Sequence, residues 1–545
     1  MSSLGEKQYG SAEKIDTEAG PTLVMTVTEL NEGAKQSAQK EIEASVWQSV
    51  KACKTGLLWC FVVSLCVIME GYDLNLLGNF FAFPRFAQKY GHYVDQESGY
   101  QLTPAWQAGL NNGSGVGAFF GTLLNGILVT RFGHRRVLIG ALAALSCFIF
   151  ITFFAKSVVM LLIGQLLCGL PWGVFATTAP AYASEVLPLN LRVYMTSWTN
   201  MCFIIGQLIA SGVLAGLVNF DSEWAYRIPF ALQWVWPAFL IPLLFFAPES
   251  PWHLVRQGRP DEAERSLRRL YSSSVSDHHI KDTLAAITKT NAMEEQLSVG
   301  TSYRDCFRGF ERRRTEIACV AFAGQVLSGS SFAYNSTYFF QQVGLTADQT
   351  YHLNVGGTGM ALVGTLCSWF FIMPYVGRRR IYISGMAAMA LVLLIIGILN
   401  TRTNNDSVGM AQAVLTLVWT FVFQLSVGQM GWSVPAEVGS TRLRQKTVCL
   451  ARNAYYIVSV ISQVLQPYFM NPTAWNLKGY TGFFWAGTAL ITLVWAIFRL
   501  PETKNRPYEE LDLLFAQRVP ARKFKTTQVD TTMHKSDNHL PVLAH

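Results

Sequence analysis

The sequence predicts an all-α membrane protein with twelve transmembrane helices, arranged as two six-helix halves related by pseudo-symmetry. Three observations lead to this fold class. Of the 545 residues, 51% are hydrophobic and only 14% are charged, with a mean hydropathy of +0.25, which is too apolar for an ordinary soluble protein. Apolar stretches long enough to cross the roughly 30 Å hydrocarbon layer recur along the chain. Short motifs of the first half return in the same order in the second half.

Twelve stretches have the length of a spanning helix, which needs roughly 17–25 residues. In the first half they cover about 54–80, 106–130, 137–155, 157–181, 194–218 and 229–247. In the second half they cover about 317–341, 350–375, 381–399, 410–434, 447–470 and 480–499. Gly and polar side chains interrupt several of them, as expected for helices that line a cavity.

Three landmarks carry the internal repeat. The pairs are Ser184-Glu185-Val186 with Ala436-Glu437-Val438, Pro248-Glu249-Ser250 with Pro501-Glu502-Thr503, and the basic turn 131–136 with 375–380. Each pair is separated by about 250 residues, so one six-helix unit occurs twice.

The remaining segments complete the domain organisation. Residues 1–50 are polar and predict a disordered cytoplasmic tail, and 501–545 predict a second cytoplasmic tail. The halves are then 51–250 and 317–500, joined by a cytoplasmic linker at 251–316 that contains a helix beginning near Pro260.

The net charge of +8 is distributed by topology. Lys and Arg concentrate in the connections on one predicted face and in the linker, which the positive-inside rule assigns to the cytoplasm together with both termini. This distribution excludes a nucleic-acid partner. Of the ten cysteines none falls in an outer loop, so neither a disulfide framework nor a metal site is expected. Asn405 begins a glycosylation sequon in a short outer loop and is a weak candidate for modification.

Two carboxyl groups lie inside the first predicted span, Glu70 and Asp73. A carboxylate at bilayer depth is costly unless it is paired, hydrated or protonated. An acid that takes up a proton on one side and returns it on the other is what proton-coupled transport requires. Both residues are therefore proton-coupling candidates, with Asp73 favoured. The alternative is that they lie near the outer interface and are only hydrated.

Carboxylates and guanidinium groups recur together at the cytoplasmic helix ends. The candidates for an inner gate network are Glu185, Arg192, Glu249, Glu437, Arg444 and Glu502, with Arg135 and Arg379 from the basic turns. Pairs such as Glu185 with Arg192 and Glu437 with Arg444 would lock the gate in one state and part in the other. The alternative is static anchoring by Arg side chains that reach the interface.

Polar and aromatic side chains within apolar spans are the substrate candidates. They are Asn200 and Gln207 in the fifth span, Gln325, Ser331 and Asn335 in the seventh, Trp432 in the tenth, and Tyr455 and Tyr456 in the eleventh. Amides donate and accept hydrogen bonds, and aromatic rings cover the apolar face of a pyranose. Their number favours a polar, uncharged solute, because Arg452, placed near an inner helix end, is essentially the only cation within a span. The alternative is hydrogen bonding between helices.

The chain resembles the sugar porters of the major facilitator superfamily over roughly 54–515. The resemblance rests on Gly71-Tyr72-Asp73, Arg131-Phe132-Gly133, Glu185 with Arg192, Pro248-Glu249-Ser250-Pro251 and Pro501-Glu502-Thr503-Lys504. Within that family, Cys168-Gly169-Leu170-Pro171-Trp172-Gly173 and Tyr182-Ala183-Ser184-Glu185-Val186 look like fungal maltose and α-glucoside permeases. The resemblance implies proton symport at the plasma membrane, with Asp73 coupling to the proton. It also implies sugar contacts at Asn200, Gln207, Gln325, Ser331, Trp432 and Tyr455–Tyr456.

The chain departs from the family pattern at several positions. Thr130 in one half and Pro374 in the other occupy the position where the family usually has an acid in the Gly-rich turn. Gln165 occupies the position in the fourth helix where many proton-coupled relatives have Arg.

The expected function is proton-coupled uptake of maltose or another α-glucoside. The transporter would need no cofactor, would act as a monomer, and would have the sugar, protons and the lipid bilayer as its partners. Transport of a hexose, cellobiose or glycosylated metabolite, facilitative transport, and a sugar sensor remain alternatives. No catalytic arrangement indicates an enzyme.

Overall fold

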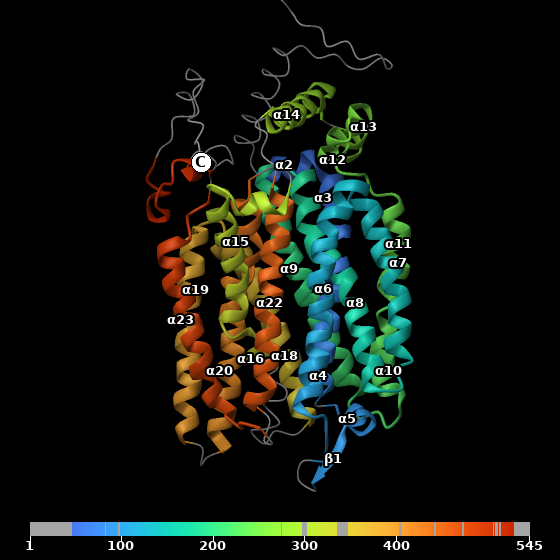
Figure 1. Ribbon diagram of the computed structural model, residues 1–545, viewed down its shortest axis with the longest axis vertical. Helices are drawn as coiled ribbons and strands as arrows, with labels where there is room; N and C mark the ends of the chain where they lie inside the picture. Colours follow the sequence, from blue (N-terminus) through green and yellow to red (C-terminus); the bar gives the residue numbers. More distant parts are fainter. Residues whose placement is uncertain are drawn as a thin grey trace, which may run out of the picture.

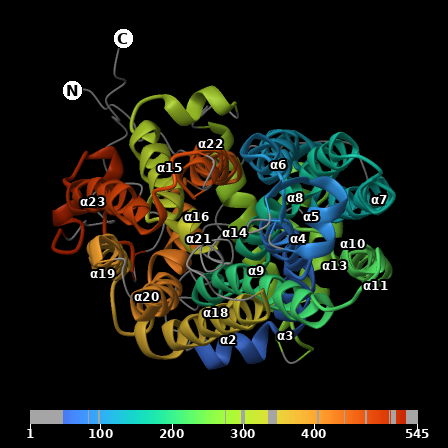
Figure 2. The ribbon, with the colours of Figure 1, turned by 90° about the horizontal axis from the view of Figure 1, so that it is seen from below.

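The computed structural model describes residues 46–81, 83–95, 99–273, 275–296, 302–334, 347–402, 406–440, 443–470, 474–504, 506, 511 and 514–527. Long helices run along one direction and form two bundles side by side, one from the first half of the chain and one from the second (Figures 1 and 2). Within the described residues twelve helices are long and apolar enough to span a membrane, which confirms the predicted fold class.

The N-terminal half contains six spans. They are α3 (Lys54–Ser64) with α4 (Cys66–Phe80), α6 (Pro104–Phe132), α7 (His134–Phe153), α8 (Val158–Val186), α9 (Leu189–Leu217), and α10 (Trp224–Leu232) with α11 (Val235–Phe245). Between the first two spans lie α5 (Pro84–Tyr90) and an antiparallel hairpin of β1 (His92–Asp95) and β2 (Gly99–Gln101). This connection marks what we call the hairpin end of the bundle (Figure 1).

The C-terminal half repeats the arrangement. Its spans are α15 (Glu311–Leu327) with α16 (Ser330–Tyr334), α18 (Ala347–Cys367) with the π-helical η2 (Ser368–Ile372), α19 (Arg378–Leu399), α20 (Asp406–Leu425) with α21 (Val427–Val438), α22 (Arg444–Met470) and α23 (Thr481–Arg499). Short turns of 3-10 helix occur at η3 (Asn400–Arg402), η4 (Lys478–Tyr480) and η5 (Ala521–Lys523).

Short helices cover the opposite end of the bundle, which we call the linker end (Figure 1). They are α2 (Val46–Ala52), α12 (Pro251–Arg256), α13 (Pro260–Leu270), α14 (Asp277–Gln296) and η1 (Tyr303–Phe307). The helix expected near Pro260 is therefore present as α13, with Asp261 and Glu262 in its first turn. These acids interact favourably with the unsatisfied N–H groups at the helix start.

Several spans extend beyond the limits expected from hydropathy. The seventh begins at Glu311 rather than 317, because Glu311 and Arg314 are buried there and lie 3.8 Å apart, with Arg314 over the rings of Phe310 and Phe515. The fourth continues to Val186 rather than 181. Paired charges and proline lower the hydropathy of a helix end without ending the helix.

The first span packs closely against the fifth, and this contact positions its two acids. A Cβ atom at Gly71 would collide with the backbone of Phe203 in α9, and one at Gly206 would collide with Ile68 in α4. The absence of side chains lets the two backbones approach, as is common between membrane helices. This contact fixes where Glu70 and Asp73 on α4 lie within the bundle, and only 1% of each residue is exposed.

Candidate functional site

One ion pair joins the two halves in the middle of the bundle. The guanidinium Nη2 of Arg452 on α22 lies 2.5 Å from Glu70 Oε1 on α4, and the residues are 2% and 1% exposed. Tyr456 bridges the pair, because its hydroxyl donates to Glu70 Oε1 at 3.0 Å and accepts from Arg452 Nε at 3.1 Å. The second carboxylate oxygen of Glu70 is buried and has no hydrogen-bond partner within the described residues.

Aromatic rings surround the Arg452 guanidinium. Its central carbon lies 4.6–5.2 Å from the ring centres of Phe322, Trp432, Tyr455 and Tyr456. Ring faces attract a cation, and more strongly where water is excluded. The expectation from sequence that Arg452 lies near an inner helix end is therefore wrong. It lies more than two turns inside α22 and is the cation of the central site.

Asp73 occupies a different environment within the N-terminal half. Its Oδ1 accepts a hydrogen bond from Gln233 Nε2 at 2.5 Å, and the amide of Gln165 is its other polar neighbour. Its Oδ2 is buried and has no partner within the described residues. Neither acid is at a hydrated interface, so the alternative interpretation from sequence does not fit the structure.

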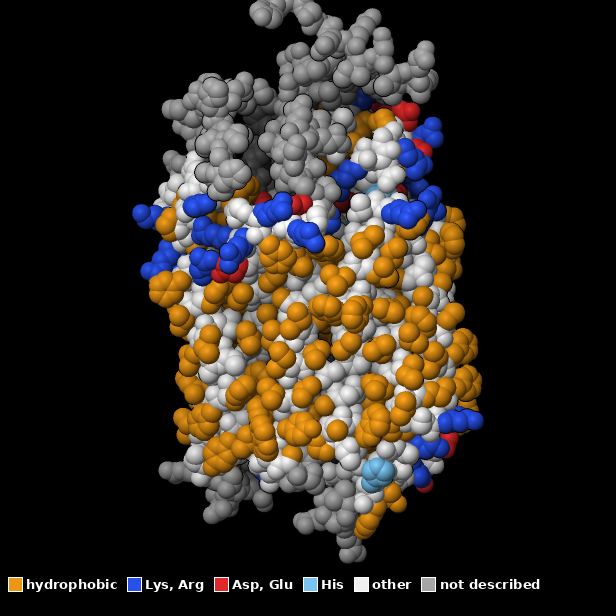
Figure 3. Space-filling view, viewed as in Figure 1, with side chains coloured by type: hydrophobic (Ala, Val, Ile, Leu, Met, Phe, Trp, Pro, Cys, Tyr) orange, Lys and Arg blue, Asp and Glu red, His pale blue; other side chains and the backbone are white. Residues whose placement is uncertain are grey.

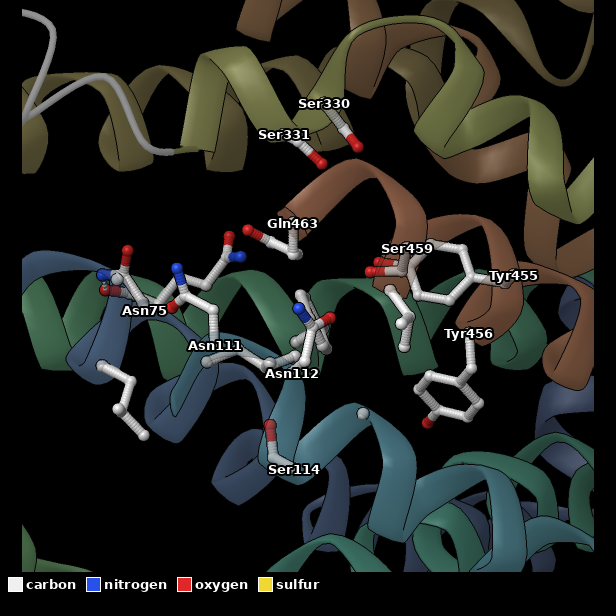
Figure 4. A pocket seen from close by; sticks show the side chains of 17 residues that line it. Asn75, Asn111, Asn112, Ser114, Ser330, Ser331, Tyr455, Tyr456, Ser459 and Gln463 are labelled. Atoms are coloured by element: carbon white, nitrogen blue, oxygen red, sulfur yellow. Dashed lines mark hydrogen bonds between the residues drawn. The ribbon is translucent and has the colours of Figure 1, made fainter. Parts of the chain in front are cut away.

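A cavity lies between the halves, on the hairpin side of the Glu70–Arg452 pair. Figure 4 shows amides and hydroxyls from α4 and α6 on one side of it and from α16 and α22 on the other. Its polar lining is Asn75, Asn111, Asn112, Ser114, Gln207, Ser330, Ser331, Tyr455, Tyr456, Ser459 and Gln463. The cavity measures about 80 Å³, below the roughly 300–1,000 Å³ of typical ligand pockets, so the halves must separate further to admit a ligand of ordinary size.

The structure brings together four of the eight sequence-predicted substrate residues. Gln207, Ser331, Tyr455 and Tyr456 line the cavity. The amide oxygen of Gln207 is buried and has no partner within the described residues, so it is available to a ligand hydroxyl.

The other candidates lie elsewhere. Trp432 packs on Phe322 and Arg452 at the edge of the central site. Asn200 donates to Gln424 Oε1 at 3.0 Å, and Gln325 donates to the Gly428 carbonyl at 2.9 Å. These two amides therefore join helices rather than line the cavity. Asn335 and the sequon residue Asn405 lie outside the described residues.

Several residues that line the cavity or contact the central pair were not among the candidates expected from sequence. Arg452, Tyr455, Tyr456, Ser459 and Gln463 share one face of α22, at helical spacings of three and four residues. That periodicity of polar and aromatic residues is the signal that would have identified Ser459 and Gln463. A second signal is the polar run Asn111-Asn112 near the start of α6.

A hydrogen-bonded network occupies the linker end of the N-terminal half. Glu249 accepts from the backbone N–H groups of His134 and Arg135 at 2.9 and 3.2 Å, which caps the first turn of α7. A Cβ at Gly133 would collide with this carboxylate, and Gly133 has φ +84°, so the turn requires glycine. His134 Nε2 lies 3.1 Å from Glu185 Oε2.

The C-terminal half contains the related network. Glu502 accepts from the backbone N–H of Arg378 at 2.8 Å, and Arg378 Nε donates to Glu437 Oε1 at 3.3 Å. A Cβ at Gly377 would collide with Glu502, as at Gly133. The two halves thus use the same geometry, with His134 in the position that Arg378 fills.

The partners of these carboxylates differ from those expected. Glu185 is contacted by His134, by the Ser250 hydroxyl at 2.5 Å and by Arg256 Nη1 at 3.5 Å, whereas Arg192 donates to the Leu187 carbonyl. The pair expected between Glu185 and Arg192 is therefore not formed.

Glu437 is likewise contacted by Arg378 and by the Thr503 hydroxyl, not by Arg444. Arg135 and Arg379 donate to the carbonyls of Ala247 and Ile497, at the ends of their own halves. The acids identified from sequence do contact the basic turns. Their partners are His134 and Arg378 in those turns, however, and not the arginines of the helices that follow each acid.

The family model described as "Sugar (and other) transporter" matches residues 59–515. The chain belongs to this sugar transporter family. A maltose permease of Saccharomyces cerevisiae is 38% identical over 532 residues, which cover 97% of this chain and 86% of the relative. A general alpha-glucoside permease of the same species is 38% identical over 525 residues, covering 95% and 85%.

Solved structures of the major facilitator superfamily share the fold of this transporter. A proton:xylose symporter bound to 6-bromo-6-deoxy-D-glucose matches with a TM-score of 0.71 at 19% identity, covering 85% of this chain and 99% of that one. An inward-open xylose transporter from E. coli matches with a TM-score of 0.60 at 19% identity, covering 84% and 99%. The curated relatives are permeases and the solved structures are transporters, so both comparisons place this chain with transporters and not with enzymes.

Proposed function

We propose that this transporter imports maltose or another α-glucoside together with a proton, by alternating access of the central cavity. The observation that carries the proposal is the buried Glu70–Arg452 pair between the halves, directly beside a cavity lined by amides, hydroxyls and tyrosine rings. The names of the permeases that share 38% identity support the substrate class.

The two acids have different parts in proton coupling. Asp73 is buried without an ion-pair partner within the described residues, and a carboxyl group in such a place is held most readily in its protonated, neutral form. Glu70 instead faces the guanidinium of Arg452 at 2.5 Å and the hydroxyl of Tyr456 at 3.0 Å. Protonation at Asp73 removes a negative charge three residues from the pair, and so changes the balance of charge around Arg452. Asp73 is the proton-coupling residue and Glu70 links its charge to the second half.

The sugar is bound by the polar lining of the cavity. Each amide of Asn112, Gln207 and Gln463 can donate to one hydroxyl and accept from another. The rings of Tyr455 and Tyr456 supply flat surfaces for the apolar face of a pyranose. A ligand that contacts α6 and α22 at once draws the two halves together, which gives binding a direct effect on the conformational equilibrium.

The networks at Glu249 and Glu502 keep each half rigid while the halves move. Both carboxylates accept backbone N–H groups within their own half, so rocking of one half against the other need not break them. The Glu185 and Glu437 contacts lie on the linker end, where the inner gate opens.

The orientation follows from charge. Lys and Arg side chains gather above the apolar belt at the linker end (Figure 3), and the positive-inside rule assigns that end to the cytoplasm. Both termini are then cytoplasmic, in a plasma membrane protein that works as a monomer. Its energy source is the proton gradient, without a bound cofactor.

The test is uptake in yeast cells that lack their own α-glucoside transporters. Addition of maltose should make the medium more alkaline, and a protonophore should abolish accumulation. Asp73→Asn should abolish accumulation while exchange of sugar across the membrane persists.

The matched control is Asp277→Asn, at a side chain that is 74% exposed on α14, and it should behave as the parent. Accumulation that survives Asp73→Asn would refute the coupling, and hexose or cellobiose uptake without maltose uptake would refute the substrate class.

A further inference from the structure

A second cavity lies at the linker end of the C-terminal half, remote from the central site. It forms where the start of α15, the end of α23 and the segment 514–527 meet, and it measures about 410 Å³. Three arginines line it, Arg313, Arg499 and Arg518, together with the rings of Phe310, Phe498 and Phe515. A cavity of this size holds a phosphate-bearing group with space to spare.

The positive charge of this cavity is only partly balanced within the described residues. Glu316 pairs with Arg499, to which its Oε1 is joined at 2.9 Å. Arg313 donates through Nη1 to the Val519 carbonyl at 2.7 Å, but its Nε is buried and has no hydrogen-bond partner there. Arg313 and Arg499 also repel each other electrostatically. An anion in the cavity would relieve this repulsion and accept from the unsatisfied donor.

Arg518 lies at this cavity in a backbone conformation that is unfavourable for a residue with a Cβ atom. Arg518 has φ +54° and ends a helical turn, in which its N–H donates to Phe515 and the N–H of Val519 donates to Leu514. Glycine is the usual residue at such a position, since a Cβ disfavours the left-handed region. The Arg518 side chain is exposed and makes no hydrogen bond or ion pair within the described part of the chain. Its charge is therefore available to a ligand.

The cavity borders the apolar surface that faces lipid. Phe498 and Phe310 are 59% and 41% exposed. In Figure 3, Lys and Arg side chains lie over the upper ends of α19 and α23, directly above the hydrophobic belt. A ligand that occupies this position meets arginines at one end and exposed rings at the other. A phospholipid matches this arrangement, because it has a charged headgroup at one end and apolar chains at the other.

We propose that this cavity binds the phosphate headgroup of an anionic membrane lipid. Arg313 and Arg518 donate to the phosphate oxygens, and the acyl chains lie along Phe498 and Phe310. Planar guanidinium groups suit phosphate oxygens, and basic pockets between helices on the cytoplasmic side are suited to anionic headgroups. A soluble phosphate has the same anionic oxygens but no chains for the exposed rings, so the lipid is the favoured source. The bound lipid joins α15 and α23 to the segment 514–527.

The test measures lipid retained by the purified full-length protein, using mixed micelles of phosphatidic acid and phosphatidylcholine. The parent should retain phosphatidic acid in preference. Arg518→Gly removes the guanidinium and also suits φ +54°, so the variant should fold at least as well as the parent. It should retain about five-fold less phosphatidic acid, the change expected for one basic residue near an anionic surface. Arg313→Gln should have a similar effect.

The matched control is Lys523→Gln, which removes a nearby exposed positive charge that does not line the cavity. Retention by this variant should equal that of the parent. Equal losses in Arg518→Gly and Lys523→Gln, or no preference for phosphatidic acid in the parent, would overturn the proposal. Displacement of the lipid by inorganic phosphate at roughly millimolar concentration would assign the site to soluble phosphate and overturn the lipid proposal. These outcomes do not depend on which sugar is transported.

Discussion

Arg452 and Glu70 form the one ion pair that crosses between the halves within the described residues, although 382 residues separate them in the chain. Removing either partner leaves the other charge buried without compensation. Glu70→Gln or Arg452→Gln should therefore lower the free energy of unfolding by about 3–5 kcal/mol, and the double variant should lose less than the sum. Thermal and denaturant unfolding of the purified protein measure this. Glu223→Gln, at an exposed pair with Lys89, should change little, and additive losses at the central pair would contradict its coupling.

The glycines before α7 and α19 should be intolerant of substitution. Gly133→Ala and Gly377→Ala each place a methyl group against the carboxylate that caps the following helix. Stability should fall by about 1–3 kcal/mol as the cap is displaced. Gly140→Ala on α7 is the matched control, because nothing lies within 4 Å of its added Cβ, and it should be neutral or stabilising. Equal effects at Gly133 and Gly140 would contradict the capping role.

Tyr303 joins the linker to both halves. Its hydroxyl packs on Gly126 of α6, where a Cβ would collide with it, and Cys449 of α22 is its polar neighbour. Tyr303→Ala should uncover Cys449 and raise its alkylation from the linker side several-fold, as measured by peptide mass spectrometry. Tyr303→Phe, which keeps the ring, should leave alkylation close to the parent level. Unchanged labelling in Tyr303→Ala would show that other groups cover the thiol.

The cavity amides should affect affinity rather than folding. Gln463→Ala and Asn112→Ala each remove an amide from the lining. One N–H of Asn112 already donates to the Ala108 carbonyl, so the loss of one hydrogen bond to the sugar is expected for each variant. The KM for the transported sugar should rise about five- to ten-fold, corresponding to about 1–1.5 kcal/mol for each lost hydrogen bond. Gln257→Ala on the linker end is the matched control. Concentration-dependent uptake measures this, and a lower maximal rate with unchanged KM would place these residues outside the sugar site.

His253 should make the linker end sensitive to acid. It faces Glu249, Glu185, His134 and Arg256, and burial lowers the pKa of His253 despite the attraction of Glu249. The folded protein then binds a proton here less readily than the unfolded chain does, so stability falls as pH drops through the usual range of histidine, near 6.5. His253→Gln should reduce that loss in melting temperatures taken between about pH 5.5 and 7.5. An identical pH profile in the variant would contradict this assignment.

The spans and the acids could be predicted from sequence because their signals are local. Hydropathy locates α4, and the cost of charge in lipid identifies Glu70 and Asp73. The partners of these acids could not be predicted in the same way. Whether Arg452 meets Glu70 depends on how α22 is rotated and on which helix of the other half it packs against. The contact of His134 with Glu185 could not be predicted for a related reason, because it depends on how α7 and α8 pack against each other.

Uncharged groups make most of the described contacts between the halves. Thr122 meets Asn453, Ser197 meets Gln429, and Asn200 meets Gln424. Each such bond contributes only about 1 kcal/mol, and water can replace it when the surfaces separate. The interface can therefore open by exchanging one partner for another, with no stranded charge along most of its length. A seam of this kind favours reversible motion over permanent closure, and the central ion pair is the one contact across it, among the described residues, whose separation would strand a charge.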